Sequence, residues 1–503
     1  MILSANAFLT GGALCFGASR PAMGFGFLTM AFLAFSPAHA DLPAFPGAEG
    51  AGAAAVGGRG GIVCKVTNLA DSGPGSLREC VNMEGPRVVV FRVGGTIVLN
   101  SQLNISNPYI TIAGQTAPGG GIQIRASDTN WSGSRLLRVA TGDVIIRYIR
   151  LRPGANGNRI TAVTAGWSGA SRVIFDHVSI SWSFDGNGFS VWSGPSDITL
   201  QNSIVAENRT NIVSGSGSES GALAIKNLDL HNNFIANASH RNPLLKTESI
   251  RYINNINYNW SSYASRTSGG VNGDFVSNLY TPGPASKGSR AQQEIQFNPY
   301  SEEMASPERA IQRDPSLYVA GNEGGQSGMD PQTDNWPYTR WVGPSENHGV
   351  LGSAPETWKR SEPLAHAGIP ITVRHVSELE EHILPTVGAS RRLDCEGHWV
   401  HNRDSIDNRV IDEYHANGGK IPSSSSTEAE FGGFPIIGSG APCADTSGDG
   451  IPDEWLKANG LDYTNPTLGR TIHGSGYSYL ELYINGLGVE RSSPASPGSI
   501  RVE

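Results

Sequence analysis

Charged residues are scarce in this sequence, and no run of lysine or arginine stands out. Only 16% of the 503 residues are Asp, Glu, Lys or Arg, and the formal net charge is -8. A nucleic-acid-binding protein usually carries a basic stripe or patch, and that footprint is missing. The chain is also 38% hydrophobic, which is too apolar for a disordered protein. An anionic polymer would therefore have to be held by a few local groups.

The sequence also lacks long helical stretches and any apolar run long enough to cross a bilayer. Its 63 Gly and 30 Pro favour a large β-rich body with many turns. The longest apolar segment, Met23 to Ala40, follows Arg20 and closes on a small-residue A-x-A pattern. This pattern is typical of a secretory signal, so we expect residues 1–40 to be removed and the mature protein to be secreted. A membrane anchor is the alternative, but the segment is too short for one.

Cysteine is rare, and no C-x-x-C pair suggests zinc. Without the signal segment, which contains Cys15, an even set of four remains. An even number in an exported chain predicts disulfides, and four cysteines allow three connectivities. The pairing Cys64–Cys80 and Cys395–Cys443 closes the shortest loops, so we predict it.

A short repeat is present in the middle of the chain. Six segments alternate apolar and polar residues over strand length: "YITIAG", "DVIIRYIRLRP", "RVIFDHVSISW", "DITLQNSIVAEN", "NLDLHNNFIANAS" and "SIRYINNINYN". Their first apolar residues are separated by 34, 29, 25, 30 and 22 residues, and they are Ile110, Val144, Val173, Ile198, Leu228 and Ile250. Repeats of this length without long helices predict a solenoid of stacked strands.

A second column accompanies the repeat four residues further on. It contains Tyr148, His177, Asn202, Asn232 and Asn254. Asparagines on successive coils can hydrogen-bond to backbone and to one another at a buried corner. The column favours an all-β, right-handed parallel β-helix, with ordinary antiparallel strands as the alternative.

Several ordered blocks resemble the pectate lyase family of β-helical polysaccharide lyases. They are "AFPGAEGAGAAAVGGRGG", "VTNLADSGPGSLRECV", "VVVFRVGGTI", "ITIAGQTAPGGGI", "VIFDHVSISWS" and "HNNFIANASHRNPLLK". The match runs from about Phe45 to Asn259, with weaker similarity to about Tyr414. The resemblance implies β-elimination along polygalacturonate, with a neutralised substrate carboxylate, a family calcium cofactor and a pectic polysaccharide as partner. We expect a monomer.

The family's base is an arginine in an R-x-P motif, which "HRNPL" places on Arg241. A guanidinium acts as a base only where its surroundings or an alkaline pH favour deprotonation. The resemblance also implies substrate contacts from Lys246, which replaces a family arginine, and from His240 and Trp182. Aromatic faces suit sugar rings, but a buried Trp182 and a structural Arg241 are the alternatives.

The family's acidic cleft residues are largely replaced here. Thr161 stands where an Asp is common, and Asp185 is followed by Gly186 instead of Glu. Asp185 is thus a lone candidate cleft ligand for calcium, which prefers several oxygen donors. The usual lysine is missing as well, unless Lys226 or Lys246 takes its place. The acid deficit leaves two alternatives open: a pectin lyase that acts on methyl-esterified chains without calcium, and a non-catalytic glycan-binding β-helix.

The C-terminal part contains a calcium-loop pattern, "DTSGDGIPDEWL". Asp445, Ser447, Asp449, the Ile451 carbonyl and Asp453 occupy EF-hand-type positions, although Leu456 stands where Glu is usual. An Asp/Gly-rich turn is the alternative.

We predict a lyase domain over 41–395, a tail with a Ser-rich linker over 396–442 and a dockerin-like calcium segment over 443–490. Five N-x-[ST] sequons begin at Asn104, Asn130, Asn208, Asn237 and Asn259.

Overall fold

The computed structural model describes most of the chain. The described residues are 42–155, 159–167, 169–215, 218–288, 293–298, 311–341, 350–351 and 354–489. The predicted signal segment, 1–40, lies outside them. Residues from Leu42 onward form one compact unit. Among the described residues, no helix has the length and apolar character needed to cross a membrane.

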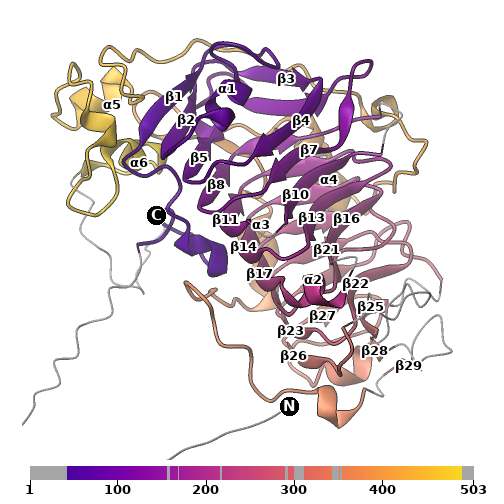
Figure 1. The fold of residues 1–503 in the computed structure, drawn as a ribbon. Helices are drawn as coiled ribbons and strands as arrows, with labels where there is room; N and C mark the ends of the chain where they lie inside the picture. Colours follow the sequence, from indigo (N-terminus) through magenta and orange to yellow (C-terminus); the bar gives the residue numbers. More distant parts are fainter. Residues whose placement is uncertain are drawn as a thin grey trace, which may run out of the picture. The chain divides into compact units, whose positions relative to one another are not determined.

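Three sheets wind around a common core, and nearly all of their strand pairs are parallel (Figure 1). The first sheet contains β1 (Ile62–Val66), β2 (Arg87–Phe91), β5 (Ile110–Ala113), β8 (Val144–Arg147), β11 (Ser171–Asp176), β14 (Ser196–Gln201), β17 (Lys226–His231), β20 (Ser249–Ile253), β23 (Asn272–Val276) and β26 (Ser316–Ala320).

The second sheet contains β4 (Ser101–Ile105), β7 (Ser132–Val139), β10 (Thr161–Gly166), β13 (Asn187–Trp192), β16 (Thr210–Gly215), β19 (Leu244–Leu245), β22 (Tyr263–Ser268), β25 (Gln293–Asn298), β28 (Arg340–Trp341) and β29 (Val350–Leu351). The third contains β3 (Gly95–Leu99), β6 (Ile122–Ala126), β9 (Ile149–Leu151), β12 (Ser179–Ser181), β15 (Ile204–Ala206), β18 (Phe234–Ala236), β21 (Ile256–Tyr258), β24 (Leu279–Thr281) and β27 (Glu323–Gly324).

The helices are short and lie outside these sheets. The α-helices are α1 (Leu77–Asn82), α2 (Glu219–Leu223), α3 (Leu379–Ile383), α4 (Ser405–His415), α5 (Asp453–Ala458) and α6 (Tyr479–Ile484). The 3-10 helices are η1 (Ala51–Ala54), η2 (Gly114–Thr116), η4 (Trp336–Tyr338), η5 (Glu356–Trp358), η6 (Val376–Glu378), η7 (Glu428–Phe431) and η8 (Leu468–Arg470). A two-stranded sheet pairs β30 (Arg391–Leu393) with β31 (Trp399–His401).

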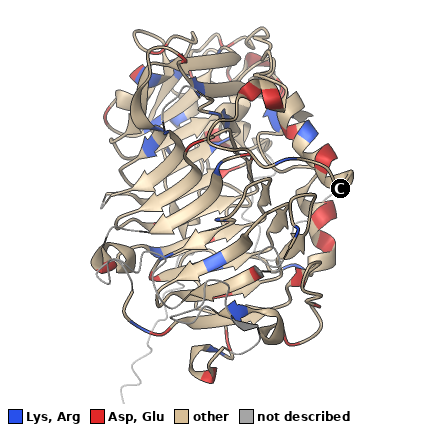
Figure 2. Cartoon of the chain, turned by 90° about the vertical axis from the view of Figure 1, so that its right-hand side faces the viewer, with Lys and Arg blue, Asp and Glu red and all other residues tan. Residues whose placement is uncertain are grey.

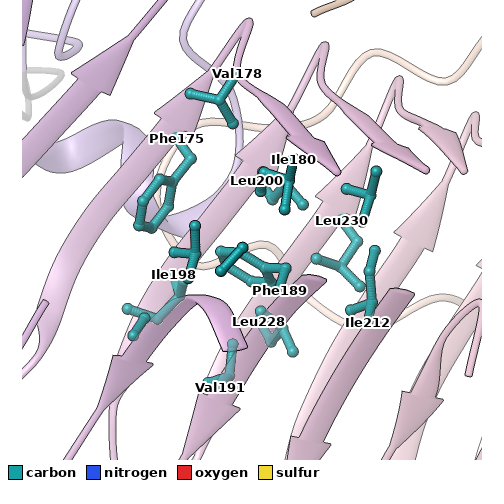
Figure 3. Packing of buried hydrophobic residues seen from close by; sticks show 14 of the residues in the cluster. Phe175, Val178, Ile180, Phe189, Val191, Ile198, Leu200, Ile212, Leu228 and Leu230 are labelled. Atoms are coloured by element: carbon teal, nitrogen blue, oxygen red, sulfur yellow. The ribbon is translucent and has the colours of Figure 1, made fainter. Parts of the chain in front are cut away.

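The predicted repeat defines the register of the first sheet. Ile110 pairs with Val144, and the partnership continues through Val173, Ile198, Leu228 and Ile250 on successive coils. The inward side chains of the three sheets pack together, as Phe175, Ile198 and Phe189 do in Figure 3. Since these apolar residues are almost completely buried, they provide the solenoid's main hydrophobic stabilisation. The prediction of a parallel β-helix is confirmed.

The predicted column forms a bend, and the continuous asparagine ladder lies one residue later. Tyr148, His177, Asn202, Asn232 and Asn254 all have φ between 50° and 55°, the left-handed conformation that Asn tolerates best. The amides that stack through the interior are instead Asn233, Asn255, Asn278, Asn322 and Asn335. Each of the last four accepts hydrogen bonds at Oδ1 from the preceding coil, which satisfies buried backbone N–H groups as well.

An N-terminal segment covers part of the first sheet. The backbone N–H groups of Ala51 and Gly52 donate to Asp229 Oδ2 and Thr199 Oγ1, at 2.6 and 2.9 Å. A Cβ atom on Gly52 would lie 2.3 Å from the carbonyl oxygen of Val173, so only glycine allows this approach.

A C-terminal segment covers part of the third sheet. Leu379 and Ile383 of α3 and Val410 of α4 pack in one buried cluster with Ile204 and Phe234. A buried ionic network fixes the start of α4. Arg152 donates to Asp404 at 2.5 Å and to Asp407 at 2.7 Å. The N-terminal segment thus covers part of the first sheet and the C-terminal segment part of the third. The candidate site lies on the second sheet.

The last described segment, which contains α5 and α6, packs on β2 through a further apolar cluster. Both predicted disulfides form: Cys64 with Cys80, and Cys395 with Cys443. The second disulfide joins the tail to the segment that covers the third sheet. The domain divisions at 395 and 442 stay predictions.

Candidate functional site

The beginning of four neighbouring strands of the second sheet brings the central residues of the site together. Asn187 pairs with Thr210 at the start of β13 and β16, and the Ile212 N–H donates to the Arg241 carbonyl at 2.8 Å. Tyr263 begins β22, the strand after β19. Arg241 itself has φ 61° and precedes a cis Asn242–Pro243 bond. Arg241 therefore lies in a left-handed bend just before β19, a strand in the middle of the second sheet.

The half-buried guanidinium of Arg241 has neutral partners. It donates from Nη1 to Asn187 Oδ1 at 3.3 Å and forms a side-chain hydrogen bond with Tyr263. Its Nε is buried and unbonded. Within the described part of the chain, no carboxylate forms an ion pair with Arg241. The sequence raised the same expectation, since no acidic residue stands near "HRNPL".

Positive charge surrounds this turn. Burial and the charges of Arg241, Arg209 and Arg266 lower the pKa of His240 to about 4, so its imidazole is neutral at pH 7. Burial also lowers the pKa of Arg266, whose guanidinium lies 4.6 Å from the centre of the Tyr263 ring. Charged side chains are sparse elsewhere on the strands, most of which are uncharged in Figure 2. An anionic ligand would find a concentrated positive potential here.

Lys246 lies at the other end of β19 from Arg241. A Cβ atom on Gly215 would lie 3.9 Å from Lys246 Cβ and 3.7 Å from the Trp192 ring. Gly215 at the end of β16 therefore lies between Trp192 and Lys246, within van der Waals distance of both. Lys226 begins β17 of the first sheet, so it does not belong to this group.

The prediction that Trp182 contacts substrate is wrong. Its side chain is fully buried, and Nε1 donates to Glu207 Oε2 at 2.9 Å. Phe184 and Phe434 pack on its ring. Trp182 directly follows β12 of the third sheet, so it lies on a different sheet from the site. Its buried cluster with Ile406 and Phe431 helps to hold the third sheet to its covering segment.

The predicted cleft metal site is not assembled by the described residues. Among them, no group of three or more His, Cys, Asp or Glu side chains could hold a metal ion. Asp185 is exposed, and a Cβ atom on Gly186 would lie 2.1 Å from the Ile160 carbonyl oxygen. No acidic side chain fits at that position. The described residues of the cleft therefore do not fit a calcium ion, and a ligand role for Asp185 has no support from its neighbours.

The C-terminal loop has turn geometry, but its carboxylates bind protein groups. Asp445 forms an ion pair with Lys65 at 2.9 Å. Asp453 accepts from Thr446, and Asp449 accepts from the N–H groups of Ile451 and Gly469. Ser447 Oγ accepts only from the Asp449 N–H among the bonds described. These aspartates, too, belong to no group of three or more His, Cys, Asp or Glu among the described residues that could hold a metal ion. The calcium loop stays a prediction.

Sequence reasoning missed three residues of the site: Asn187, Tyr263 and Arg266. Asn187 lies within the stretch "FDGNG", directly after Gly186, and its position on the repeat was the signal that could have found it. Tyr263 and Arg266 lie beyond the last segment aligned by sequence. Three sequons are also excluded as glycan acceptors in the folded protein, because Asn208, Asn237 and Asn259 are fully buried.

The chain is similar in sequence and structure to several known proteins. No protein-family model matches the chain. The chain is 35% identical over 470 residues to probable pectate lyase C of Aspergillus fumigatus, which covers 92% of this chain and 97% of that protein. Probable pectate lyase C of Aspergillus flavus is 33% identical over 452 residues, covering 89% and 94%. With pectate lyase II from Xanthomonas campestris the TM-score is 0.44 at 16% identity, covering 68% of this chain and 98% of that one.

A solved pectate lyase bound to a hexasaccharide gives a TM-score of 0.42 at 12% identity, covering 70% of this chain and 99% of that chain. At these values the structural likeness adds nothing to the sequence match. The β-helix and the full-length relatives define a polysaccharide lyase. The chain belongs to the pectate lyase family.

Proposed function

We propose that this protein is secreted and cleaves polygalacturonate by β-elimination, with Arg241 as the base. The products would be oligogalacturonides with a 4,5-unsaturated end. One observation carries the proposal: Arg241 has the neutral partners Asn187 and Tyr263 in a region crowded with positive charge. The names of the relatives, probable pectate lyases, support the substrate class.

The arrangement suits the removal of a weakly acidic proton. The base takes the proton from C5 of a uronate, a double bond forms between C4 and C5, and the bond from C4 to the glycosidic oxygen breaks. The leaving oxygen gains a proton from water, and the protonated base later releases its proton to water. A carboxylate partner would favour the charged form of a guanidinium, and none forms an ion pair with Arg241 among the described residues. The neighbouring cations Arg209 and Arg266, whose charges act on His240, would stabilise the negative charge that develops on the substrate carboxylate.

Apart from water, these steps involve only side chains of the protein and groups of the substrate. Calcium bound in the cleft would neutralise the substrate carboxylate, but the described residues do not gather the oxygen donors that calcium prefers. A second candidate substrate is therefore methyl-esterified pectin, whose ester groups need no such neutralisation. The neutral side chain of Thr161 and the close backbone contact at Gly186 favour this candidate.

The test measures the formation of unsaturated uronide by absorbance, with polygalacturonate and with esterified pectin, in calcium and in excess chelator. We expect an alkaline optimum and a fall in kcat of about 10³-fold in Arg241→Lys, within the range of general-base removal. Unchanged binding of polygalacturonate by this variant would separate catalysis from affinity. Activity that persists in chelator and is higher on esterified pectin than on polygalacturonate would identify the protein as a pectin lyase. Absence of product with every substrate, despite binding, would leave a glycan-binding protein.

A further inference from the structure

Two arginines and a tryptophan form a compact group on the second sheet, away from Arg241. The guanidinium of Arg138 lies 4.1 Å from the centre of the Trp167 ring, and that of Arg135 lies 4.6 Å from it. Both arginines come from β7, and Trp167 directly follows β10 with φ 65°. An indole is the best aromatic partner for a guanidinium, so the ring holds both cations in place.

Among the described residues, neither arginine has a carboxylate partner. Arg135 Nη1 donates to the Ser134 hydroxyl at 2.8 Å, and Arg138 Nε is buried without a hydrogen bond. Two adjacent cations repel each other, and burial and this repulsion together lower the pKa of Arg135. Hydrogen-bond donors of this kind are complementary to a carboxylate, which a guanidinium can bind with two parallel bonds.

The strand register aligns this group with the candidate active site. Arg138 pairs with Thr164, and the same row continues through Ser190, Val213 and Leu244 to Arg266. Four strand steps separate β7 from β19, or roughly 19 Å at ~4.8 Å for each step. Trp192 and Lys246 lie along the intervening strands. A polymer that crosses the strands could contact both groups at once.

We propose that Arg135, Arg138 and Trp167 form a distal subsite that binds the carboxylate of a uronate unit several sugars away from the cleavage point. The proposal rests on the proposed function for the identity of the polymer. The two arginines bind the carboxylate, and Trp167 is a positioning residue that orients them. Because the subsite is remote from the reacting atoms, it contributes to the affinity for long chains and leaves the chemical step unchanged.

The test compares the wild type with the double variant Arg135→Gln/Arg138→Gln on polygalacturonate and on trigalacturonate. We expect KM for the polymer to rise about tenfold, with kcat changed less than about twofold, because uniform binding is lost. Kinetic constants for the trimer should not change. Trp167→Ala should give the same pattern more weakly, and Trp167→Phe should restore part of the polymer affinity.

Arg125→Gln is the matched control, since Arg125 also lies over a ring, that of Phe434, at 4.8 Å, but belongs to β6 of the third sheet. Its polymer KM should equal that of the wild type. Equal polymer KM in the double variant and the control would overturn the subsite. Equal losses on the polymer and the trimer would also overturn it, because they would indicate general damage to the fold.

A binding measurement separates this proposal from the proposed function. Affinity electrophoresis in a gel that contains polygalacturonate needs no turnover, so it is done in the Arg241→Ala background with and without the double substitution. Because the double substitution also removes two positive charges, the migration of each variant is expressed relative to its migration in a gel without polygalacturonate. Weaker relative retardation of the triple variant supports the subsite even if the wild type forms no unsaturated product. Equal relative retardation overturns the subsite even if the wild type is an active lyase.

Discussion

Asn187 Oδ1 accepts hydrogen bonds from both Arg241 Nη1, at 3.3 Å, and Thr210 Oγ1, at 2.6 Å. The three side chains come from successive coils of the second sheet. An amide oxygen can orient a guanidinium without the full negative charge that would lock it in its protonated form. The amide of Asn187 therefore gives the candidate base Arg241 a neutral partner, which a carboxylate at this position would not.

Asn187→Asp should lower kcat more than Asn187→Ala does. The new carboxylate would form an ion pair with Arg241 and would compete with the substrate carboxylate for the positive charge of the site, so kcat should fall about a hundredfold. Asn187→Ala removes the orienting bond without adding charge and should lower kcat about tenfold. The rate of unsaturated-product formation measures both. Equal kcat values for the Asp and Ala variants would contradict the importance of a neutral partner for Arg241.

The buried imidazole of His240 should make stability fall in weak acid. In the unfolded chain His240 takes up a proton near pH 6.5, whereas Arg241, Arg209, Arg266 and burial delay protonation in the folded protein to about pH 4. The unfolded state therefore binds more protons in this window, so the stability present above pH 6.5 is lost as the pH falls towards 4.

This difference in pKa corresponds to about 3 kcal/mol. His240→Gln should remove that part of the pH dependence. Urea unfolding at pH 7.5 and at pH 4 gives the comparison, and the wild type should lose about 3 kcal/mol more than the variant. An NMR titration midpoint near 6.5 for His240 would disprove the assignment.

The asparagine ladder should be more sensitive to substitution than the bends beside it. Asn255 donates to Asn278 Oδ1 and to the carbonyls of Leu230 and Ile253, and accepts from Asn233. Asn255→Ala leaves several buried groups without partners and should cost about 3 kcal/mol. Asn202→Gly keeps the left-handed bend at Asn202 and should cost about 1 kcal/mol. Urea unfolding midpoints give the comparison. Equal losses of unfolding free energy in the two variants would show that the ladder contributes no more to stability than the bends do.

Calcium should stabilise the C-terminal loop if the spacing of its acidic residues is functional. Three aspartates lie within nine residues, and among the described residues Lys65 pairs only with Asp445, so a divalent cation would relieve the repulsion between Asp445 and Asp449. We expect millimolar calcium to raise the Tm by a few degrees, about the effect of 1 kcal/mol. Asp449→Asn should abolish the rise and Asp185→Asn should not. An equal Tm of the wild type with and without calcium would mean that the loop is a polar turn that binds no calcium.

Local pattern was enough to predict the repeat and both disulfides. The alternation within each segment predicted a strand, and the repeated positions of Ile110, Val144 and Val173 predicted their pairing, because each coil packs directly on the next one. The disulfides followed from loop length. The ladder was misplaced by one residue, since adjacent Asn232 and Asn233 both recur on the repeat and only the backbone bend decides which one points inward.

The sequence by itself determined the coil repeat, the cysteine pairs and the motif that singles out Arg241. Only the tertiary structure decided which side chains share its surroundings: it buried Trp182, joined Asn187 and Tyr263 to Arg241, and set Arg135 and Arg138 against Trp167. The reason is geometric. In a β-helix, residues more than twenty positions apart become neighbours at strand spacing, and a change of one residue in phase turns a side chain from the surface into the core.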